Sequence, residues 1–237
     1  MSVINTVFIF AAGLGTRLKP LTNDIPKPLV KINGKYLLYY ALELLLKFPL
    51  ERIVINSHYL PDQIKKAVDE FKILYPQVPE IVLVYEPELL DTGGGLKNAV
   101  CYYKSDVIFT LNSDVIILSK TNILQDMVDM WNDDMHGLCL LQKKSNAIGY
   151  HGKGDFDLCE NYAITNNSVN LPYVYAGLSL INTKFVIEDK KKIFSLGEYY
   201  IKENKFHGII NDGDWYHVGY IEDLEYIENA ISINSYC

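Results

Sequence analysis

Two cations near the start of the chain stand in a setting that suits phosphate chemistry. The stretch "FIFAAGLGTRLKPLTNDIPKPLV", Phe8–Val30, places Arg17 shortly after two glycines and Lys27 between two prolines. Glycines let the backbone approach an anion closely and aim N–H groups at it. Arginine offers a bidentate fork and lysine a point charge, while the prolines fix the backbone around Lys27. The whole string therefore favours a polyphosphate ligand over a tight turn with solvated charges.

Two better-known glycine motifs do not fit this loop. The dinucleotide-binding fingerprint needs a third glycine where the chain has Leu18, and the P-loop needs a Gly-Lys-Ser/Thr that the sequence lacks. A dinucleotide-dependent oxidoreductase would also need an acidic residue at the end of the second strand, where the chain reads "INSH". The sequence argues against both enzyme classes.

Two further polar loops follow later strands. In "EPELLDTGGGLKNAV", three glycines around Gly94 are expected to precede a helix, and their backbone could form a flat slot for a nucleobase or sugar edge. The alternative is a loose helix cap. In "NSDV", Asp114 follows a buried strand. A carboxylate that faces bound phosphates needs a divalent cation between them, although an Asx turn is the plainer interpretation of this aspartate alone.

These loops need strands that end at one edge of a sheet. Strands with two apolar faces alternate with helical patterns in the first part of the chain, which predicts a doubly wound, mostly parallel α/β sheet. Ligands of such sheets bind outside the carboxyl ends of the strands. The expected strands are Val3–Phe10, Arg52–Asn56, Ile81–Tyr85, Val107–Leu111 and Leu138–Gln142. The expected helices are Tyr36–Phe48, Asp62–Leu74, Gly94–Tyr103 and Asn122–Asp133.

The regular alternation of strand and helix patterns ends after Lys143. The second part is turn-rich, and we expect it to add a lobe to the first part within a single domain, 1–237, with a first half (1–143) and a second half (144–237). Its expected strands are Tyr173–Ile181, Phe206–Ile210 and Asp214–Val218, and its expected helices are Ile193–Asn204 and Ile221–Ile233.

Composition narrows the choice of partners. The formal charge is −7, from 22 Lys+Arg against 29 Asp+Glu, which argues against a nucleic-acid partner. The four cysteines have no Cys-x-x-Cys spacing, which favours a reducing, cytoplasmic setting. No apolar run is long enough to cross a bilayer, and the first residues suggest a strand rather than a leader.

Several of these motifs together resemble a known family. "AAGLGTRLKPLTNDIPKPLV" is similar to the signature of sugar-1-phosphate nucleotidyltransferases, and "NSD" resembles that family's metal-binding turn. "LLDTGGGL", "GKGDFDL", "YVYAGLSLI" and "WYHVGY" have counterparts in the same order. The resemblance runs nearly end to end and implies a Rossmann-like, glycosyltransferase-A-like fold. The short chain most resembles the N-acetylmuramate-1-phosphate uridylyltransferases of peptidoglycan recycling.

The resemblance implies roles for individual residues. It assigns catalysis to Arg17, Lys27 and Asp114, and Mg²⁺, with Mn²⁺ as the alternative, to Asp114. The implied nucleotide-binding residues are Ala11, Ala12, Gly13, Gly15, Thr16, Lys27, Gly94 and Asn112. The implied sugar-phosphate-binding residues are Asp155, Gly177 and His217.

The C-terminal motif departs from the family pattern. Many relatives have Trp-x-Asp-x-Gly-Thr, with Asp as second metal ligand. In "WYHVGY", this chain has His217 in place of the Asp and Tyr220 in place of the Thr. Imidazole suits softer metals than Mg²⁺. His217 would therefore either coordinate the metal and shift its preference towards Mn²⁺ or Co²⁺, or donate a hydrogen bond to a phosphate. We expect the hydrogen bond.

The expected reaction joins an NTP and a sugar-1-phosphate to give an NDP-sugar and pyrophosphate. The subgroup implies UTP and N-acetylmuramate-1-phosphate in cell-wall recycling. A mannose-1-phosphate guanylyltransferase, a cytidylyltransferase and a catalytically impaired nucleotide-sugar-binding regulatory protein are the alternatives. We expect a monomer or small homo-oligomer.

Overall fold

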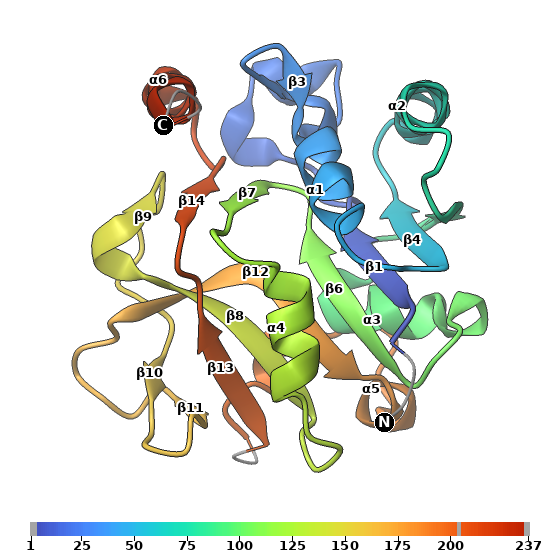
Figure 1. The fold of residues 1–237 in the computed structure, drawn as a ribbon. Coiled ribbons are helices and arrows are strands. Elements are labelled where there is room, and N and C mark those ends of the chain that lie inside the picture. The colour runs from blue at the N-terminus through green and yellow to red at the C-terminus, as the bar shows by residue number, and fades with distance from the viewer. Residues whose placement is uncertain (1–3, 203–204, 235–237) are drawn as a thin grey trace.

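A seven-stranded sheet forms the centre of the protein in the computed structural model, which describes residues 4–202 and 205–234 (Figure 1). Its strand order is β13-β8-β12-β6-β1-β4-β5. These strands are β1 (Thr6–Phe10), β4 (Arg52–Ser57), β5 (Glu80–Tyr85), β6 (Val107–Asn112), β8 (Gly137–Lys143), β12 (Tyr173–Asn182) and β13 (Phe206–Ile210). Only β12 runs antiparallel to its neighbours among the described strands of this sheet, so the mostly parallel α/β prediction is confirmed.

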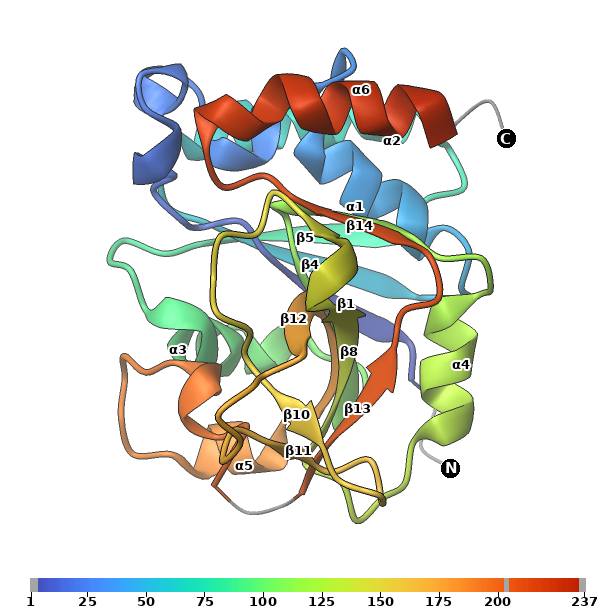
Figure 2. The same cartoon turned by 90° about the vertical axis from the view of Figure 1, so that its left-hand side faces the viewer.

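The sheet is covered on both faces, as its two-sided apolar strands require. Alternate residues of β1 enter different cores: Val7 and Ile9 pack with α1, α2 and α4, whereas Phe8 packs with α3 and α5. Figure 2 shows α4 on one side of the sheet and α3 with α5 on the other. The helices are α1 (Leu37–Leu45), α2 (Pro61–Leu74), α3 (Asp91–Asn98), α4 (Ile123–Met130), α5 (Lys184–Glu188) and α6 (Leu224–Asn234).

A second, three-stranded sheet of order β7-β14-β9 was not predicted as such. β14 (Asp214–His217) pairs antiparallel with β7 (Val115–Leu118) and parallel with β9 (Ala147–Ile148). Helix α6 lies above it in Figure 2, and Ile227 and Ile231 of α6 enter a small core beneath. This sheet holds His217 opposite Val115, next to Asp114. Short hairpins β2 (Lys31–Ile32) with β3 (Lys35–Tyr36) and β10 (Asp157–Leu158) with β11 (Ile164–Thr165) complete the strands.

The predicted strands agree with those observed to within one residue at each end, apart from the first, whose Val3 lies outside the described residues. The helix predicted over Ile193–Asn204 is wrong: the described part of this segment, 193–202, contains a single 3₁₀ turn, Leu196–Glu198, and residues 203 and 204 lie outside the described residues. Phe194, Leu196 and Tyr200 are buried against the sheet's second core, with Gly197 between them. These three side chains reach the core from an irregular segment, not from one face of a helix.

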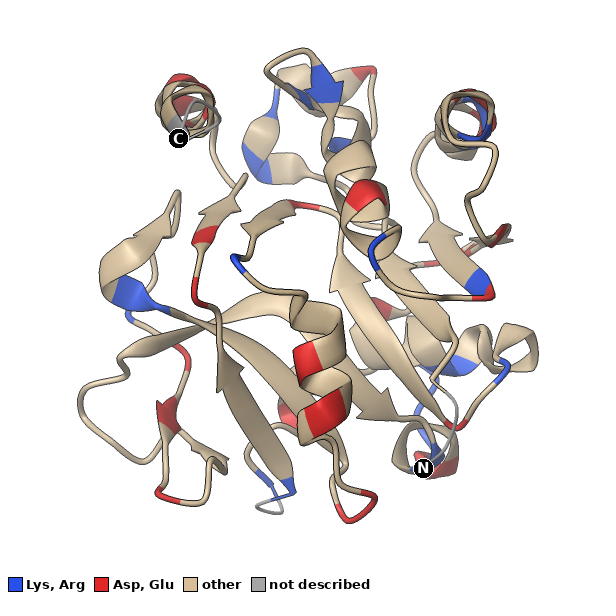
Figure 3. Ribbon diagram, in the orientation of Figure 1, with Lys and Arg blue, Asp and Glu red and all other residues tan. Residues whose placement is uncertain are grey.

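Charged residues of both signs are interspersed along the chain (Figure 3). Within the described part of the chain, no helix combines the length and the apolar character that a membrane crossing requires.

Candidate active site

The loops that follow β1, β4, β5 and β6 surround a cavity of about 530 Å³ at the carboxyl edge of the sheet. This is where parallel sheets bind ligands. Residues at the carboxyl ends of these strands or in the loops after them line the cavity, among them Ala12, Gly13, Lys27, Asn56, Glu86, Thr92, Asn112 and Asp114. The sheet therefore brings together the first and third loops as the sequence predicts.

The first loop leaves room beside its backbone. A Cβ built on Gly13 would meet no heavy atom within 4 Å. Gly15 has a left-handed φ of 63°, and a Cβ there would come within 2.9 Å of Cβ of Lys27. The Thr22 hydroxyl donates to the Gly15 carbonyl at 2.8 Å and holds the turn. Gly13 thus offers space to a ligand, whereas Gly15 lets Lys27 approach the loop.

Lys27 and Asp114 form the central ion pair of the cavity. The lysine Nζ lies 2.5 Å from Oδ2 of Asp114, and the side chains are 13% and 23% exposed. Lys27 begins a 3₁₀ turn after an extended Pro26, which aims it across the cavity. Burial alone would raise the pKa of the Asp114 carboxyl, but the charges of Lys27 and His217 and the hydrogen bond from Lys27 lower it. Asp114 is therefore an ionised carboxylate at neutral pH.

The ring of His217 presents a lone pair to this carboxylate. Its Nδ1 lies 3.3 Å from the Gly149 carbonyl oxygen, which can only accept, so Nδ1 carries the proton. Burial lowers the pKa of His217 more than the nearby Asp114 raises it, which favours the neutral ring. Nε2, 3.8 Å from Oδ2 of Asp114, is then an acceptor. Whether His217 coordinates a metal ion or contacts a phosphate stays a prediction.

Arg17 lines a smaller adjoining cavity of about 230 Å³. Gly13, Gly15, Thr16, Lys27, Asp114 and Gly219 line the same space. The two predicted catalytic cations therefore face one continuous region around Asp114.

Asn56 lies near the end of β4, and Glu86, which was not predicted as a site residue, directly follows β5. Oδ1 of Asn56 accepts from the Ala11 N–H at 2.7 Å, and its Nδ2 donates to Oε1 of Glu86 at 2.8 Å. Glu86 is 1% exposed and lines the cavity, and burial raises the pKa of its carboxyl. The pair fixes the start of the first loop and leaves a carboxyl at the cavity wall. The position of Glu86 directly after β5, at the ligand edge of the sheet, could have indicated its place in the site.

The second loop has a different structure from the one expected. Its glycines lie inside α3, which begins at Asp91, rather than before the helix. A Cβ on Gly93 would overlap the Phe194 ring, and one on Gly94 would overlap the Lys192 carbonyl. The Gly93 and Gly94 N–H groups both donate to the Phe194 carbonyl, at 2.9 and 3.2 Å. The nucleotide-binding role of Gly94 stays a prediction.

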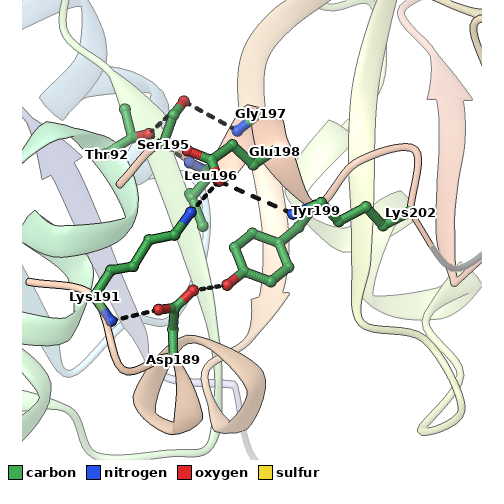
Figure 4. Close-up of polar contacts among 9 residues, drawn as sticks. All are labelled: Thr92, Asp189, Lys191, Ser195, Leu196, Gly197, Glu198, Tyr199 and Lys202. Carbon is green, nitrogen blue, oxygen red and sulfur yellow. Dashed lines mark hydrogen bonds and ion pairs between the residues drawn. The ribbon is translucent and has the colours of Figure 1, made fainter. Parts of the chain in front are cut away.

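The segment that covers these glycines, Asp189–Lys202, is tied down by polar contacts (Figure 4). The Thr92 hydroxyl accepts from the Leu196 N–H at 2.9 Å, while Lys191 pairs with Glu198 at 2.6 Å. Thr92 lines the cavity, so the second half of the chain supports one of its walls.

Asp155 and Gly177, two of the predicted sugar-phosphate-binding residues, contact other residues of the protein. The carboxylate of Asp155 accepts from the Tyr150 hydroxyl at 3.0 Å and from the Tyr175 N–H at 2.9 Å. Gly177, at a φ of 82°, packs against Asn112 at the irregularity of β12. Their contact with a sugar phosphate stays a prediction.

Asp114 is the candidate metal-binding carboxylate of this site. The described residues contain no cluster of three or more His, Cys, Asp or Glu side chains arranged to hold a metal ion. Mg²⁺ commonly takes one or two carboxylates and completes its shell with water and substrate phosphates. A single carboxylate beside a phosphate-sized space therefore fits this ion once phosphates are present.

Comparisons with known proteins show the family to which the chain belongs. The nucleotidyl transferase family model matches residues 6–152. The chain is 30% identical to an N-acetylmuramate alpha-1-phosphate uridylyltransferase of Caulobacter vibrioides, over 89% of this chain and 90% of that protein. It is 28% identical to a mannose-1-phosphate guanyltransferase of Gibberella zeae, over 91% of this chain and 61% of that protein.

Solved structures share the fold. HddC of Yersinia pseudotuberculosis, complexed with GMP-PN, superposes with a TM-score of 0.78 at 23% identity, covering 96% of this chain and 100% of that one. The inositol-1-phosphate CTP transferase of T. maritima has a TM-score of 0.78 at 18% identity, covering 97% and 95%. The family match covers more than half of the chain and the Caulobacter relative nearly all of it, so the protein belongs to the nucleotidyl transferase family.

Proposed function

We propose that this protein transfers a nucleotidyl group from an NTP to a sugar-1-phosphate and releases pyrophosphate. The observation that carries the proposal is the convergence of Lys27, Arg17 and Asp114 around the open backbone at Gly13. The names of the relatives, which include a sugar-1-phosphate uridylyltransferase and a guanyltransferase, support the same reaction class.

The chemistry requires positioning and charge stabilisation. A phosphate oxygen of the sugar-1-phosphate attacks the α-phosphorus, a new P–O bond forms, and the bond to the β-phosphate oxygen breaks as pyrophosphate leaves with the electron pair. The attacking phosphate is already anionic near neutral pH, so no general base is needed. Lys27 and Arg17 bind the phosphates and stabilise the charge of the transition state.

The Lys27–Asp114 pair suggests how the site changes when substrate arrives. Phosphate oxygens compete with Asp114 for Lys27, which frees a carboxylate oxygen of Asp114. Asp114, with Nε2 of His217 as a second candidate, would hold Mg²⁺ or Mn²⁺. Such an ion, when bound, neutralises phosphate charge and orients the phosphates.

UTP and N-acetylmuramate-1-phosphate are the proposed substrates, with a role in cell-wall recycling. The support is the 30% identity to the Caulobacter uridylyltransferase over 90% of that protein. GTP with mannose-1-phosphate is the alternative, supported by the Gibberella guanyltransferase. Glu86 offers an acceptor to a base N–H, which both uracil and guanine possess, so it does not decide between them.

Pyrophosphate release measured with four NTPs against a panel of sugar-1-phosphates tests the proposal. With Mg²⁺, we expect fastest release from UTP and N-acetylmuramate-1-phosphate. Faster release from GTP and mannose-1-phosphate would select the alternative substrates. Nucleotide binding with no pyrophosphate release from any pair would favour a regulatory protein instead.

A further inference from the structure

Arg17 is held in place by contacts with Tyr220, a residue from the other end of the chain. Its Cζ lies 5.0 Å from the centre of the Tyr220 ring, and its Nη1 donates to the Tyr220 hydroxyl at 3.3 Å. Arg17 is an exposed residue of a glycine loop, where a long side chain would otherwise sample many rotamers. Arginine stacks favourably on aromatic faces, so the tyrosine restricts it to one region.

Tyr220 is itself supported from a third part of the chain. The edge of the His151 ring meets it at a centroid distance of 4.9 Å, and Nε2 of His151 lies 2.8 Å from Oδ2 of Asp223. Just before Tyr220, the Val218 N–H donates to the Asp114 carbonyl at 3.0 Å. The ring is therefore placed relative to Asp114 as well as to Arg17.

The contact between Arg17 and Tyr220 lies beside the smaller cavity. Gly219, the residue before Tyr220, lines the smaller cavity together with Arg17 and Lys27. An arginine already ordered at this wall loses less conformational entropy when it binds phosphates. Tyr220 is only partly buried, whereas its neighbours Tyr216 and Val218 are fully buried in the small core. Its ring therefore contributes less to the core than to the arginine.

We propose that Tyr220 is a positioning residue that presents Arg17 to the nucleotide phosphates. The inference rests on the proposed function, because it needs a phosphate ligand at Arg17. It differs from a purely structural role in one measurable respect: the effect of Tyr220 must pass through Arg17.

A double-mutant cycle tests this dependence. Dissociation constants for UTP and GTP with Mg²⁺ would be measured by calorimetric titration for the wild type, Tyr220→Leu, Arg17→Ala and the double variant. We expect Tyr220→Leu to weaken nucleotide binding about two- to fivefold, the size of an exposed cation–π contact. In the Arg17→Ala background, the same substitution should change nothing further. Equal losses in both backgrounds would overturn the proposal.

Two further variants act as controls. One separates the contribution of the Tyr220 ring from that of its hydroxyl, and the other shows the effect of losing a surface tyrosine away from the site. Tyr220→Phe keeps the stacked ring and should retain most of the affinity. Tyr226→Leu, an exposed tyrosine of α6, is the matched control and should bind as the wild type does. An unchanged dissociation constant for Tyr220→Leu would refute the positioning role alone. A wild type that binds neither nucleotide would refute this inference and the proposed function together, whereas binding without turnover refutes only the latter.

Discussion

The two glycine loops of this protein look alike in sequence and serve opposite purposes. In the first loop, nothing lies within 4 Å of a Cβ built on Gly13, so the absent side chain leaves space for a ligand. In the second, the space beside Gly93 and Gly94 is filled by Phe194 and Lys192 of the same chain. A glycine run at the ligand edge of a sheet can therefore admit either a substrate or another part of the protein.

The two loops also differ in their free hydrogen-bond donors. Helix N-termini bind anions through unpaired N–H groups. In α3 the Gly93 and Gly94 N–H groups already donate to the Phe194 carbonyl. The carbonyl oxygen of Phe194, about a hundred residues further along the chain, thus occupies two N–H groups that could otherwise bind an anion. We therefore expect the phosphates to bind at the first loop and its two cations.

The largest effect that this comparison predicts belongs to the first loop. Lys27→Ala should lower kcat by about 10²–10³, the usual cost of removing a group that stabilises transition-state charge. Steady-state pyrophosphate release is the measurement. Lys19→Ala, an exposed lysine of the same loop, is the control and should keep its activity. Near wild-type kcat in Lys27→Ala would remove the lysine from the mechanism.

The second loop should respond through stability. An exposed helical Gly→Ala change usually stabilises by about 1 kcal/mol. At Gly93 the new methyl would overlap the buried Phe194 ring, and overpacking typically costs about 1–3 kcal/mol. We expect the cost of the overlap to exceed the gain in helix propensity, so that the variant is less stable than the wild type. Each kcal/mol lost lowers Tm by about 2–4 °C in a chain of this size.

Differential scanning calorimetry of Gly93→Ala shows whether Tm falls, as expected, or rises. Gly93→Ala with Phe194→Leu should recover part of the loss, because the smaller side chain can move aside. A Gly93→Ala protein as stable as the wild type would show that Phe194 does not need the space.

The smallest effect concerns Glu86, the first residue of the second loop, whose hydrogen bond to Asn56 connects it to Ala11 at the start of the first loop. Burial raises the pKa of its carboxyl above the ordinary 4.5, against hydrogen bonds from Asn56 and the Leu90 backbone. The folded protein then binds a proton that the unfolded chain has released. The contribution of Glu86 to the free energy of unfolding is thus greatest below pH 4.5 and is lost as pH rises through the folded pKa.

Glu86→Gln cannot titrate, so its Tm relative to the wild type should increase between pH 4.5 and 7.5. Paired thermal unfolding curves across this range are the measurement. A constant difference would mean that the carboxyl has an ordinary pKa in the folded protein.

Much of this architecture was predictable because it depends on local patterns. Two-sided apolar runs gave the strands of the main sheet, and the rule that ligands bind at their carboxyl ends correctly grouped Gly13, Lys27 and Asp114. The family prediction, which rested on the first signature and the "NSD" turn, is confirmed by the nucleotidyl transferase match.

What could not be predicted depends on contacts distant in sequence. The segment around Phe194 has helix-forming residues, but its buried side chains pack across α3 and prevent a helix. The proton position on His217 depends on the Gly149 carbonyl, which no pattern in "WYHVGY" reveals. The contact of Tyr220 with Arg17 spans 203 residues and likewise has no local signal.

One titration tests most directly whether the first loop is the nucleotide-binding loop. Gly13→Ala adds a methyl where the free protein has open space, so its Tm should equal that of the wild type. The methyl would occupy the space through which phosphates approach the backbone, so calorimetric titration with UTP and Mg²⁺ should show binding weakened at least about tenfold, or 1.4 kcal/mol. An unchanged dissociation constant in a Gly13→Ala protein of normal stability would contradict the account, because the nucleotide would then bind elsewhere.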